Sequence, residues 1–422
     1  MRTPGQVWLG ACVGTNLTLG VASQLVVVAL LGLGADSDAM FASQTGYLVI
    51  FSILGAALGT VLTPMMAREF MTRNRVSLLL YLKPLLPFFA LISAMLWSGA
   101  ENLTVLLFGG LAAETRELTS RMAHTYSLVL LVSLLNVVLS SARRASGRHS
   151  RVEASEAVAG AAYLIGVVVL VPEAGVAAVP ALALARAFIS AALLLDREDL
   201  RAGDTPETSH AVPIAAGLRS TLAGFSLVKT APLVDRHLCS RAGEGELALV
   251  SVLSAVISTF AALIERSVLA PLLVRATREL ELAGGRRFAA SYGRTFVPLT
   301  ALSIMASIAG VTLSGTLLEA AIRAGWHNAA GLEKAVELAS VMSLCFLGVP
   351  GQTAASVLYA MGKHGTVTRI AAANFLVATT MKFLLFPLVG ALAVAIGAAA
   401  YQILNSVVLH VVLHREPEDR HE

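Results

Sequence analysis

The polar and apolar positions of the chain follow one simple pattern, in which long apolar stretches alternate with short polar connections from end to end. Each stretch is about 20 residues long and holds few charges, which suits a helix that crosses a ~30 Å hydrocarbon core. The alternating segments of about 10 residues that are typical of membrane barrels are absent from the sequence. The pattern predicts about twelve membrane-spanning helices, over residues 7–33, 39–66, 78–100, 118–141, 154–171, 174–195, 213–238, 247–273, 292–317, 337–360, 367–389 and 391–413.

Basic residues are concentrated in every second connection between these segments. The even-numbered connections hold Arg68, Arg73, Arg75, Arg143, Arg144, Arg148, Arg151, Arg197, Arg201, Arg275, Arg278, Arg286, Arg287 and Lys363, whereas the odd-numbered ones hold Arg116, Arg241, Arg323 and Lys334. Cytoplasmic loops of membrane proteins are enriched in Lys and Arg. We therefore expect a multi-pass protein of the bacterial inner (plasma) membrane with both termini in the cytoplasm.

Two short motifs occur twice, in the same order. The copies are Thr63-Pro64-Met65-Met66-Ala67-Arg68-Glu69 with Ala270-Pro271-Leu272-Leu273-Val274-Arg275, 207 positions apart, and Ala145-Ser146-Gly147-Arg148-His149 with Ala360-Met361-Gly362-Lys363-His364, 215 positions apart. A repeated membrane topology is typical of transporters, in which two lobes enclose a central site. The repeat predicts an all-α polytopic membrane protein of two six-helix lobes, residues 1–196 and 213–414, with a cytoplasmic linker at 197–212 and a cytoplasmic tail at 415–422.

Composition agrees with this class and excludes others. The chain is 56% hydrophobic and 14% charged, with a mean hydropathy of +0.75, whereas soluble domains are about 25% charged. The basic residues are scattered in short turns with no aromatic platform, so nucleic acid is not an expected partner. Cys12, Cys239 and Cys345 lie far apart and show no metal-binding or disulfide spacing. No nucleotide-binding loop, paired carboxylates or nucleophile–base set is visible, so we expect neither a cofactor nor an enzyme.

Several stretches resemble the MurJ/MviN family of lipid flippases. The first predicted outer turn, Leu31-Gly32-Leu33-Gly34-Ala35-Asp36-Ser37-Asp38-Ala39-Met40-Phe41, is similar to the family's Phe-Gly-Ala-Gly followed by Asp-Ala-Phe-Phe. Further similar stretches are Leu62-Thr63-Pro64, Ala113-Glu114-Thr115-Arg116, Gly147-Arg148 and Leu233-Val234-Asp235. The resemblance implies a MATE-like member of the MOP exporter superfamily that flips undecaprenyl-linked saccharides, either lipid II as MurJ does or glycan repeat units as the Wzx-like branch does.

The chain departs from the family in two ways. MurJ usually has fourteen helices, the last two of which form a lipid-binding groove, whereas twelve are predicted here. MurJ also carries cavity arginines on helices one, two and eight. The matching positions in this chain are Leu17 and Ser23 on helix one and Ser254 or Ala255 on helix eight, and helix two has no basic residue before Arg68. The arginine contacts that would hold a diphosphate in MurJ are therefore missing at those positions.

The charged residues inside the predicted spans are the main candidates for a site, because a charge at mid-bilayer costs at least ~2.5 kcal/mol on insertion scales. Arg219, Glu265 and Arg266 lie about two turns from the cytoplasmic ends of helices seven and eight. In one interpretation they form a basic, charge-paired rim that receives a diphosphate. In the other, Arg219 pairs with Glu265 and Arg266 extends to the membrane interface. Lys229 lies deeper on helix seven and is expected to face a cavity and bind phosphate or carboxylate, the alternative being a structural partner on another helix. Arg186, near the middle of helix six, either binds substrate or ties two helices of the first lobe together.

Three uncharged or acidic positions complete the candidate set. Asp235 matches the family's acid on helix seven and is a candidate for ion coupling or charge pairing. Asn16 lies on helix one, which lines the cavity in the family. Asp38 is expected to cap the start of the second helix, since Asp is a favoured residue at helix N-termini.

Two structural expectations concern single residue types. Lys382 lies within about two turns of a helix end and is expected to extend to the membrane interface. Proline and glycine predict interruptions of helix three at Pro84 and Pro87 and of helix ten around Gly348, Pro350 and Gly351.

The sequence as a whole predicts a flippase that moves a polyprenyl-diphosphate-linked saccharide to the outer leaflet for cell-wall or peptidoglycan synthesis. Arg219, Lys229 and Arg266 would offset the diphosphate charge, and an ion gradient or the membrane potential would supply the energy. Two alternatives stay open. The missing family arginines favour a non-transporting scaffold that binds envelope glycan synthases, and a multidrug antiporter of the same superfamily would need an acidic cavity in place of the mainly basic one predicted here.

Overall fold

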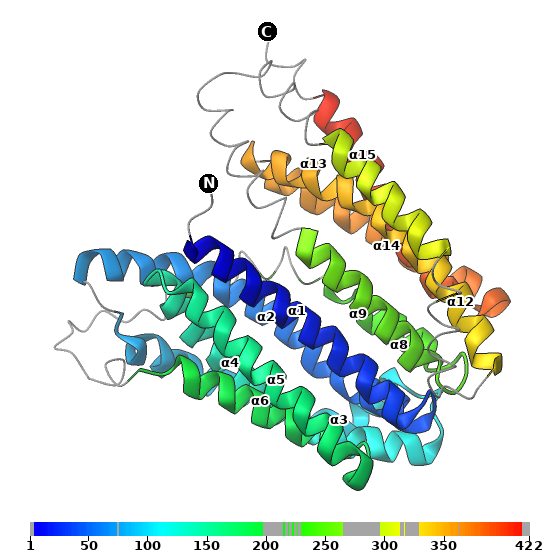
Figure 1. Cartoon of the computed structure of the whole chain (residues 1–422), viewed down its shortest axis with the longest axis horizontal. Coiled ribbons are helices and arrows are strands. Elements are labelled where there is room, and N and C mark those ends of the chain that lie inside the picture. Colours follow the sequence, from blue (N-terminus) through cyan, green and yellow to red (C-terminus); the bar gives the residue numbers. More distant parts are fainter. Residues whose placement is uncertain are drawn as a thin grey trace. The chain divides into compact units, whose positions relative to one another are not determined.

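The computed structural model is built of helices, and no strand occurs among the residues that it describes. These are residues 4–73, 76–196, 214–215, 218, 222, 226, 229–264, 296–312, 316, 329–361 and 363–415. The chain divides into two compact units, Met1–Ala248 and Leu249–Glu422, and each unit has a hydrophobic core of its own. Figure 1 shows the helices coloured along the chain from blue to red.

Unit 1 opens with six helices that correspond to the first six predicted spans, which confirms that part of the pattern. They are α1 (Pro4–Leu31), α2 (Ala35–Arg73), α3 (Leu78–Leu107), α4 (Ala113–Ala145), α5 (His149–Ala174) and α6 (Ala178–Leu194). α8 (Ala231–Cys239) and the start of α9 (Glu246–Ile264) complete the described part of the unit. These two helices overlap the seventh and eighth predicted spans. The predicted linker at 197–212 lies outside the described residues, so the division into lobes at that point stays a prediction.

α4 lies at the centre of unit 1. It packs against α2, α3 and α6, while α5 packs against α1 and α6 (Figure 1). The core between these helices includes Leu58, Leu62, Tyr81, Leu130 and Leu134, none of which is more than 1% exposed. Because lipid tails are as apolar as leucine, such a core stabilises a membrane protein mainly through close van der Waals packing between helices.

The outward faces of the helices are apolar as well, and α3 illustrates this. Tyr81 and Phe89 on its inner face are buried, whereas Leu91, Met95 and Leu106 on its other face are 59%, 64% and 70% exposed. A soluble protein rarely exposes so much contiguous apolar surface. Nine helices among the described residues are long and apolar enough to cross a membrane, and the chain is therefore a multi-pass membrane protein.

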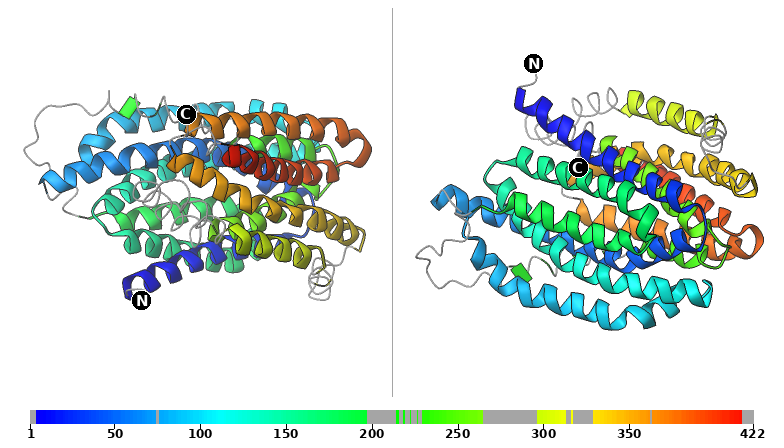
Figure 2. Two further views of the ribbon diagram at one scale, coloured as in Figure 1. Left: turned by 90° about the horizontal axis from the view of Figure 1, so that it is seen from above. Right: turned by 60° about the horizontal axis from the view of Figure 1, so that its bottom comes forward.

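Unit 2 contains the last four predicted spans. An apolar helix at Phe296–Thr312 is followed by α12 (Ala329–Ser343), a 3-10 segment (Leu344–Gly348), α13 (Val349–Ala360), α14 (His364–Val389) and α15 (Leu392–Arg415). α15 packs against α12, the 3-10 segment, α13 and α14, and Figure 2 shows α14 and α15 (orange and red) side by side.

The predicted interruption of helix ten is confirmed and has a packing role. The α-helix ends at Ser343, and five residues of 3-10 helix precede α13. Gly348 and Gly351 lie directly against α15, where a Cβ on Gly351 would stand only 2.4 Å from the Cα of Ser406. Glycine is therefore required at Gly351 for the close approach of α13 to α15.

Two sequence expectations are wrong. Pro84 and Pro87 do not interrupt α3, which runs unbroken from Leu78 to Leu107. Lys382 does not extend to the membrane interface, because it is only 4% exposed. Its aliphatic carbons cross α15 at Gly397, where a Cβ would stand 2.3 Å from the Cγ of the lysine. Because Gly397 has no side chain, there is space beside α15 in which the Lys382 side chain is buried.

Candidate functional site

The predicted basic group on helices seven and eight is only partly within the described residues. Arg219, Glu265 and Arg266 lie outside them, so their grouping stays a prediction. Lys229 lies in a helical turn just before α8, and its side chain is exposed. Asp235 lies on α8 and is partly exposed. Asn16 lies on α1, partly exposed, and its side chain makes no hydrogen bond with any residue of the described part.

Arg186 forms an ion pair across two neighbouring helices. Its Nη2 atom on α6 lies 3.7 Å from Oε2 of Glu156 on α5, and its guanidinium carbon lies 5.9 Å from the centre of the Tyr163 ring. Ser190 donates a hydrogen bond of 2.7 Å to the other oxygen of the same carboxylate. This geometry agrees with the interhelical tie, one of the two roles predicted for Arg186.

Aromatic and amide side chains extend this polar interior of unit 1. The rings of Tyr47 on α2 and Tyr126 on α4 stack with centres 5.9 Å apart, and the Tyr47 hydroxyl lies 3.4 Å from the hydroxyl of Ser133. Asn136 on α4 donates a hydrogen bond of 2.8 Å to the carbonyl of Ala187 on α6. Tyr47 and Tyr126 were not among the residues predicted for a site, although a tyrosine in the middle of an apolar span is a signal for such a polar interior.

Close polar contacts join α2 to α8 and to the N-terminus of α9 within unit 1. Asp38 does not cap α2, which begins three residues earlier at Ala35, so that prediction is wrong. Its buried carboxylate accepts hydrogen bonds from the backbone N–H groups of Gly245 at 2.6 Å and Ala248 at 2.8 Å. These amides belong to the N-terminus of α9 and would otherwise lack partners. Asp38 is therefore the N-terminal cap of a helix that begins more than two hundred residues later.

The capping is reciprocal. Glu244, just before α9, accepts a hydrogen bond of 3.0 Å from the backbone N–H of Ala35, the first residue of α2. Gly245 allows this close arrangement because its φ is +83° and a Cβ there would lie 3.1 Å from the Leu33 carbonyl. Each helix thus receives its acidic cap from the other, and the macrodipoles of both helices favour a negative charge at these positions.

α8 is anchored to the same end of unit 1. Arg236 donates hydrogen bonds to the Phe41 carbonyl at 2.9 Å and to the Thr45 hydroxyl at 3.0 Å on α2. His237 bonds through Nδ1 to the Leu107 carbonyl at the end of α3, 2.7 Å away. The first, third and seventh connections therefore meet at one end of the unit. The predicted topology requires this, because it places all odd-numbered connections on the same side of the membrane.

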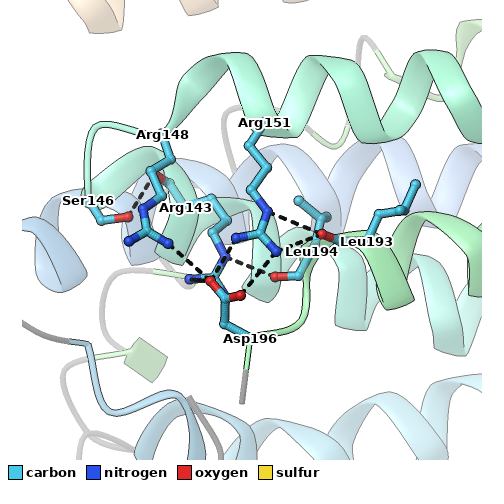
Figure 3. A network of polar contacts seen from close by, with 7 residues as sticks. All are labelled: Arg143, Ser146, Arg148, Arg151, Leu193, Leu194 and Asp196. Atoms are coloured by element: carbon cyan, nitrogen blue, oxygen red, sulfur yellow. Dashed lines mark hydrogen bonds and ion pairs between the residues drawn. The ribbon is translucent and has the colours of Figure 1, made fainter. Parts of the chain in front are cut away.

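An arginine cluster gathers at the opposite ends of α4, α5 and α6 (Figure 3). Asp196 lies 2.7 Å from Arg151, 3.0 Å from Arg148 and 3.3 Å from Arg143. The hydrogen bonds from Arg151 and the positive charges of Arg143, Arg151 and Arg148 lower the pKa of the Asp196 carboxyl. The fourth and sixth connections, both predicted to be cytoplasmic, are therefore brought together here.

A cavity of about 630 Å³ opens in unit 2 between the helix at Phe296–Thr312, the 3-10 segment, the start of α13 and the C-terminal half of α15. Leu347, Val407 and Val411 give it apolar walls, and His414 and Arg415 lie at its polar end. The sequence analysis did not predict it, because its walls come from separate helices. Within the described residues, no group of three or more His, Cys, Asp or Glu side chains could hold a metal ion.

Comparison with solved structures identifies the fold. No protein-family model matches the sequence, and no curated protein matches it. The lipid II flippase MurJ in an inward closed conformation matches with a TM-score of 0.82 at 14% identity, over 97% of this chain and 87% of MurJ. An inward-facing multidrug resistance MATE family transporter of the MOP superfamily matches at 0.79 and 13%, over 96% and 95% of the two chains.

A third match is a MOP superfamily transporter from Pyrococcus furiosus, whose binding pocket of reverse polarity suggests a different function. It has a TM-score of 0.68 at 11% identity, over 98% of this chain and 95% of that one. Nearly the whole chain takes part in each match, so the likeness extends over both units and not over a single helical hairpin. The chain is a multi-pass membrane protein with the fold that MurJ and the MATE transporters of the MOP superfamily share.

Proposed function

We propose that the chain is a flippase that moves a polyprenyl-diphosphate-linked saccharide from the inner to the outer leaflet of a bacterial inner membrane for cell-envelope synthesis. The observation that carries the proposal is the match to MurJ over 97% of this chain. The stretches around Asp38 and at Leu233-Val234-Asp235 support it, because their residues resemble motifs of the MurJ/MviN family. Fold alone does not specify a substrate, and the chemistry of the charged residues supplies the rest of the argument.

In the proposed mechanism the head group enters between the two lobes, while the lipid tail stays in the bilayer. Arg219, Lys229 and Arg266 offset the negative charge of the diphosphate, since ammonium and guanidinium groups form strong charge-assisted hydrogen bonds with phosphate. Asn16 contacts the saccharide or its phosphates from the first lobe, and Arg186 is the second candidate there, although its pairing with Glu156 agrees with the interhelical tie. The lobes then rock to open outward.

Energy for the cycle comes from an ion gradient or from the membrane potential, which supplies ~2.3 kcal/mol per charge per 100 mV. Glu265 and Asp235 are the proposed coupling or charge-pairing acids. The reciprocal caps of α2 and α9 add a constraint, because any movement that separates the first turns of these helices must break the hydrogen bonds of Asp38 and Glu244.

Two other functions have observations in their favour. The MATE family transporter that matches with a TM-score of 0.79 favours a multidrug antiporter. The positions of the family's cavity arginines, occupied here by Leu17 and Ser23, favour a non-transporting scaffold for envelope glycan synthases. We place the flippase first because the charges in the predicted spans of helices seven and eight are mainly basic, which suits an anionic head group better than a cationic drug.

Complementation separates these functions. The chain is expressed in cells whose MurJ can be depleted and, in parallel, in a strain that lacks its glycan-unit flippase. Rescue of the first strain identifies lipid II as a substrate, and rescue of only the second identifies a glycan repeat unit. If neither strain is rescued although the chain is present in the membrane, the non-transporting scaffold replaces the flippase as the favoured function.

A reconstituted assay tests the assigned residues. Purified protein in vesicles is expected to flip a fluorescent polyprenyl-diphosphate saccharide, and the Lys229→Ala, Arg219→Ala double variant is expected to lose most of that rate. Lys229→Arg, which keeps the charge, serves as the matched control and should retain more of it. A double variant as fast as the unmodified protein would remove these residues from the proposed site.

A further inference from the structure

Part of the arginine cluster has a structural role at the end of α6. The last carbonyls of a helix lack partners within the helix, and here two arginines donate to them. Arg143 bonds to the Leu194 carbonyl at 2.8 Å, and Arg151 bonds to the Leu193 carbonyl through Nη2 at 3.0 Å. Asp196 then lies within 3.3 Å of both guanidinium groups. These three charged residues account for the end of α6 without any ligand.

Arg144 and Arg148 are not needed for that role. Their side chains are 41% and 54% exposed, whereas that of Arg143 is 7% exposed. Arg144 forms an ion pair with Glu153 at 3.5 Å, and Arg148 shares the carboxylate of Asp196 with two other arginines. Four arginines thus face two carboxylates among the described residues, which leaves a formal surplus of two positive charges on the exposed side of the cluster.

The lipid-facing surface of unit 1 begins directly beside this charge. Leu193 and Leu195 flank the arginines at the end of α6, and each is 41% exposed. Figure 3 shows the Leu193 side chain pointing away from the arginine cluster. On the neighbouring α5, Val158 and Ile165 are 54% and 65% exposed. Because α5 and α6 pack together, an apolar surface lies next to a positively charged end.

The repeat in the sequence offers an internal comparison. The equivalent connection of the second lobe reads Met361-Gly362-Lys363-His364 and carries one basic residue, where the first lobe has Arg143, Arg144, Arg148 and Arg151. The repeated topology therefore does not require four arginines at this position. A cytoplasmic loop needs some positive charge for its orientation, and the connection at Met361-Gly362-Lys363-His364 has a single lysine for it.

We propose that this end of unit 1 binds an anionic phospholipid that is not itself transported. The lipid phosphate lies at Arg148 and Arg144, and its acyl chains lie along the outer apolar face of α5 and α6. Guanidinium groups suit this ligand because their planar donors pair with two phosphate oxygens at once. Basic pockets between membrane helices on the cytoplasmic side are a common way to hold anionic head groups.

Native mass spectrometry of the purified full chain tests the proposal, with phosphatidylglycerol and phosphatidylcholine offered at equal concentration. The expected result is retention of phosphatidylglycerol in preference to phosphatidylcholine. The Arg144→Gln, Arg148→Gln double variant should bind phosphatidylglycerol about thirtyfold more weakly, in line with the usual contribution of two basic residues near an anionic membrane surface. The matched control is Lys363→Gln, which should bind phosphatidylglycerol as the unmodified chain does.

Soluble glycerol phosphate forms a separate arm. If it displaces phosphatidylglycerol fully, the site recognises free phosphate and the lipid proposal is overturned. Equal binding of the two lipids, or unchanged binding by the double variant, also overturns it. Arg148→Gln alone replaces the double variant if the latter does not purify as a single species.

The linker 197–210 carries acids such as Glu198 and Asp199. Lipid binding seen only after their change to Gln and Asn would show that the linker covers the arginines instead.

The two proposals fail independently. Flipping of the polyprenyl-linked probe by the Arg144→Gln, Arg148→Gln variant measures the transport function alone, since neither arginine belongs to the proposed transport site. Loss of phosphatidylglycerol binding with an unchanged flipping rate supports the lipid site and leaves the proposed function untouched.

Discussion

Replacement of Asp38 by Asn tests the reciprocal capping of α2 and α9. Asp38 is 1% exposed and accepts two backbone hydrogen bonds, from Gly245 at 2.6 Å and Ala248 at 2.8 Å. Asn has nearly the same shape but only one acceptor oxygen. One amide of α9 keeps a neutral hydrogen bond, and the other faces the donor NH₂ group of the new side chain. The substitution therefore removes one partner without leaving a cavity.

The expected cost follows from these two bonds. A hydrogen bond to a charged group contributes about 1.5–3 kcal/mol, a neutral one about 0.5–1.5 kcal/mol, and an unpaired buried N–H costs about 1–3 kcal/mol. Loss of one charged bond (about 2 kcal/mol) and weakening of the second to a neutral bond (about 1 kcal/mol) together give about 3 kcal/mol for opening the first turn of α9, and the cost of the unpaired amide is already contained in the first of these values. Part of the gain from the native carboxylate is offset by its burial, so this is an upper value. It corresponds to ~100-fold in the local opening equilibrium.

Hydrogen exchange followed by mass spectrometry measures this opening directly. Amides in the peptide that covers residues 243–250 should exchange up to ~100-fold faster in Asp38→Asn, while a peptide from the first turns of α5 should not change. Asp36→Asn is the matched control, because Asp36 lies on the same turn with an exposed side chain. Equal protection of residues 243–250 in Asp38→Asn and in the unmodified protein would refute the capping argument.

Three further predictions concern packing and charge. Gly351→Ala should lower the melting temperature, because a Cβ there lies 2.4 Å from the backbone of α15 and overpacking costs about 1–3 kcal/mol. Gly365→Ala is the control and should not lower the melting temperature, because a Cβ at Gly365 would lie in open space. Asp196→Asn should lower the melting temperature at neutral pH. The pKa of Asp196 in the folded protein is lowered from about 3.9. The difference in melting temperature between the variant and the unmodified protein should therefore persist above pH 4 and disappear as the pH falls through the folded pKa. A difference in melting temperature that is constant with pH would contradict this. If Arg186 and Glu156 form an interhelical tie, the Arg186→Gln variant should lose more stability than the variant that carries both Arg186→Gln and Glu156→Gln. Melting-temperature shifts that simply add in the double variant would exclude the tie.

Much of the fold could be predicted from the sequence because the membrane makes a local demand on the chain. Every backbone polar group in hydrocarbon must be paired within its own segment, so apolar stretches of sufficient length become helices whatever surrounds them. The first six predicted spans are all helices, and the Gly-Pro-Gly region around Pro350 does interrupt a helix. Prediction failed at Pro84 and Pro87, where α3 continues through both prolines.

The candidate site was harder to predict from the sequence than the helices were. The side chains that could be named from the sequence were charges in apolar segments, and their partners depend on which helices become neighbours. Arg186 was recognised as one such charge, but its pairing with Glu156 follows from the contact of α5 with α6. Lys382 was expected at the membrane interface, yet it is buried because Gly397 on α15 leaves space for its stem.

The sequence by itself determined the class of this protein, the positions of its helices and the basic character of alternate connections, since each depends on the local balance of apolar and charged residues. Only the tertiary structure decided that Asp38 caps α9, that Glu244 caps α2, and that Arg143 and Arg151 close the end of α6. In each case a helix end needs a partner for its unpaired backbone groups, and any suitable side chain that packing brings within reach can supply it. Which side chain does so depends on distances in space and not on spacing along the chain.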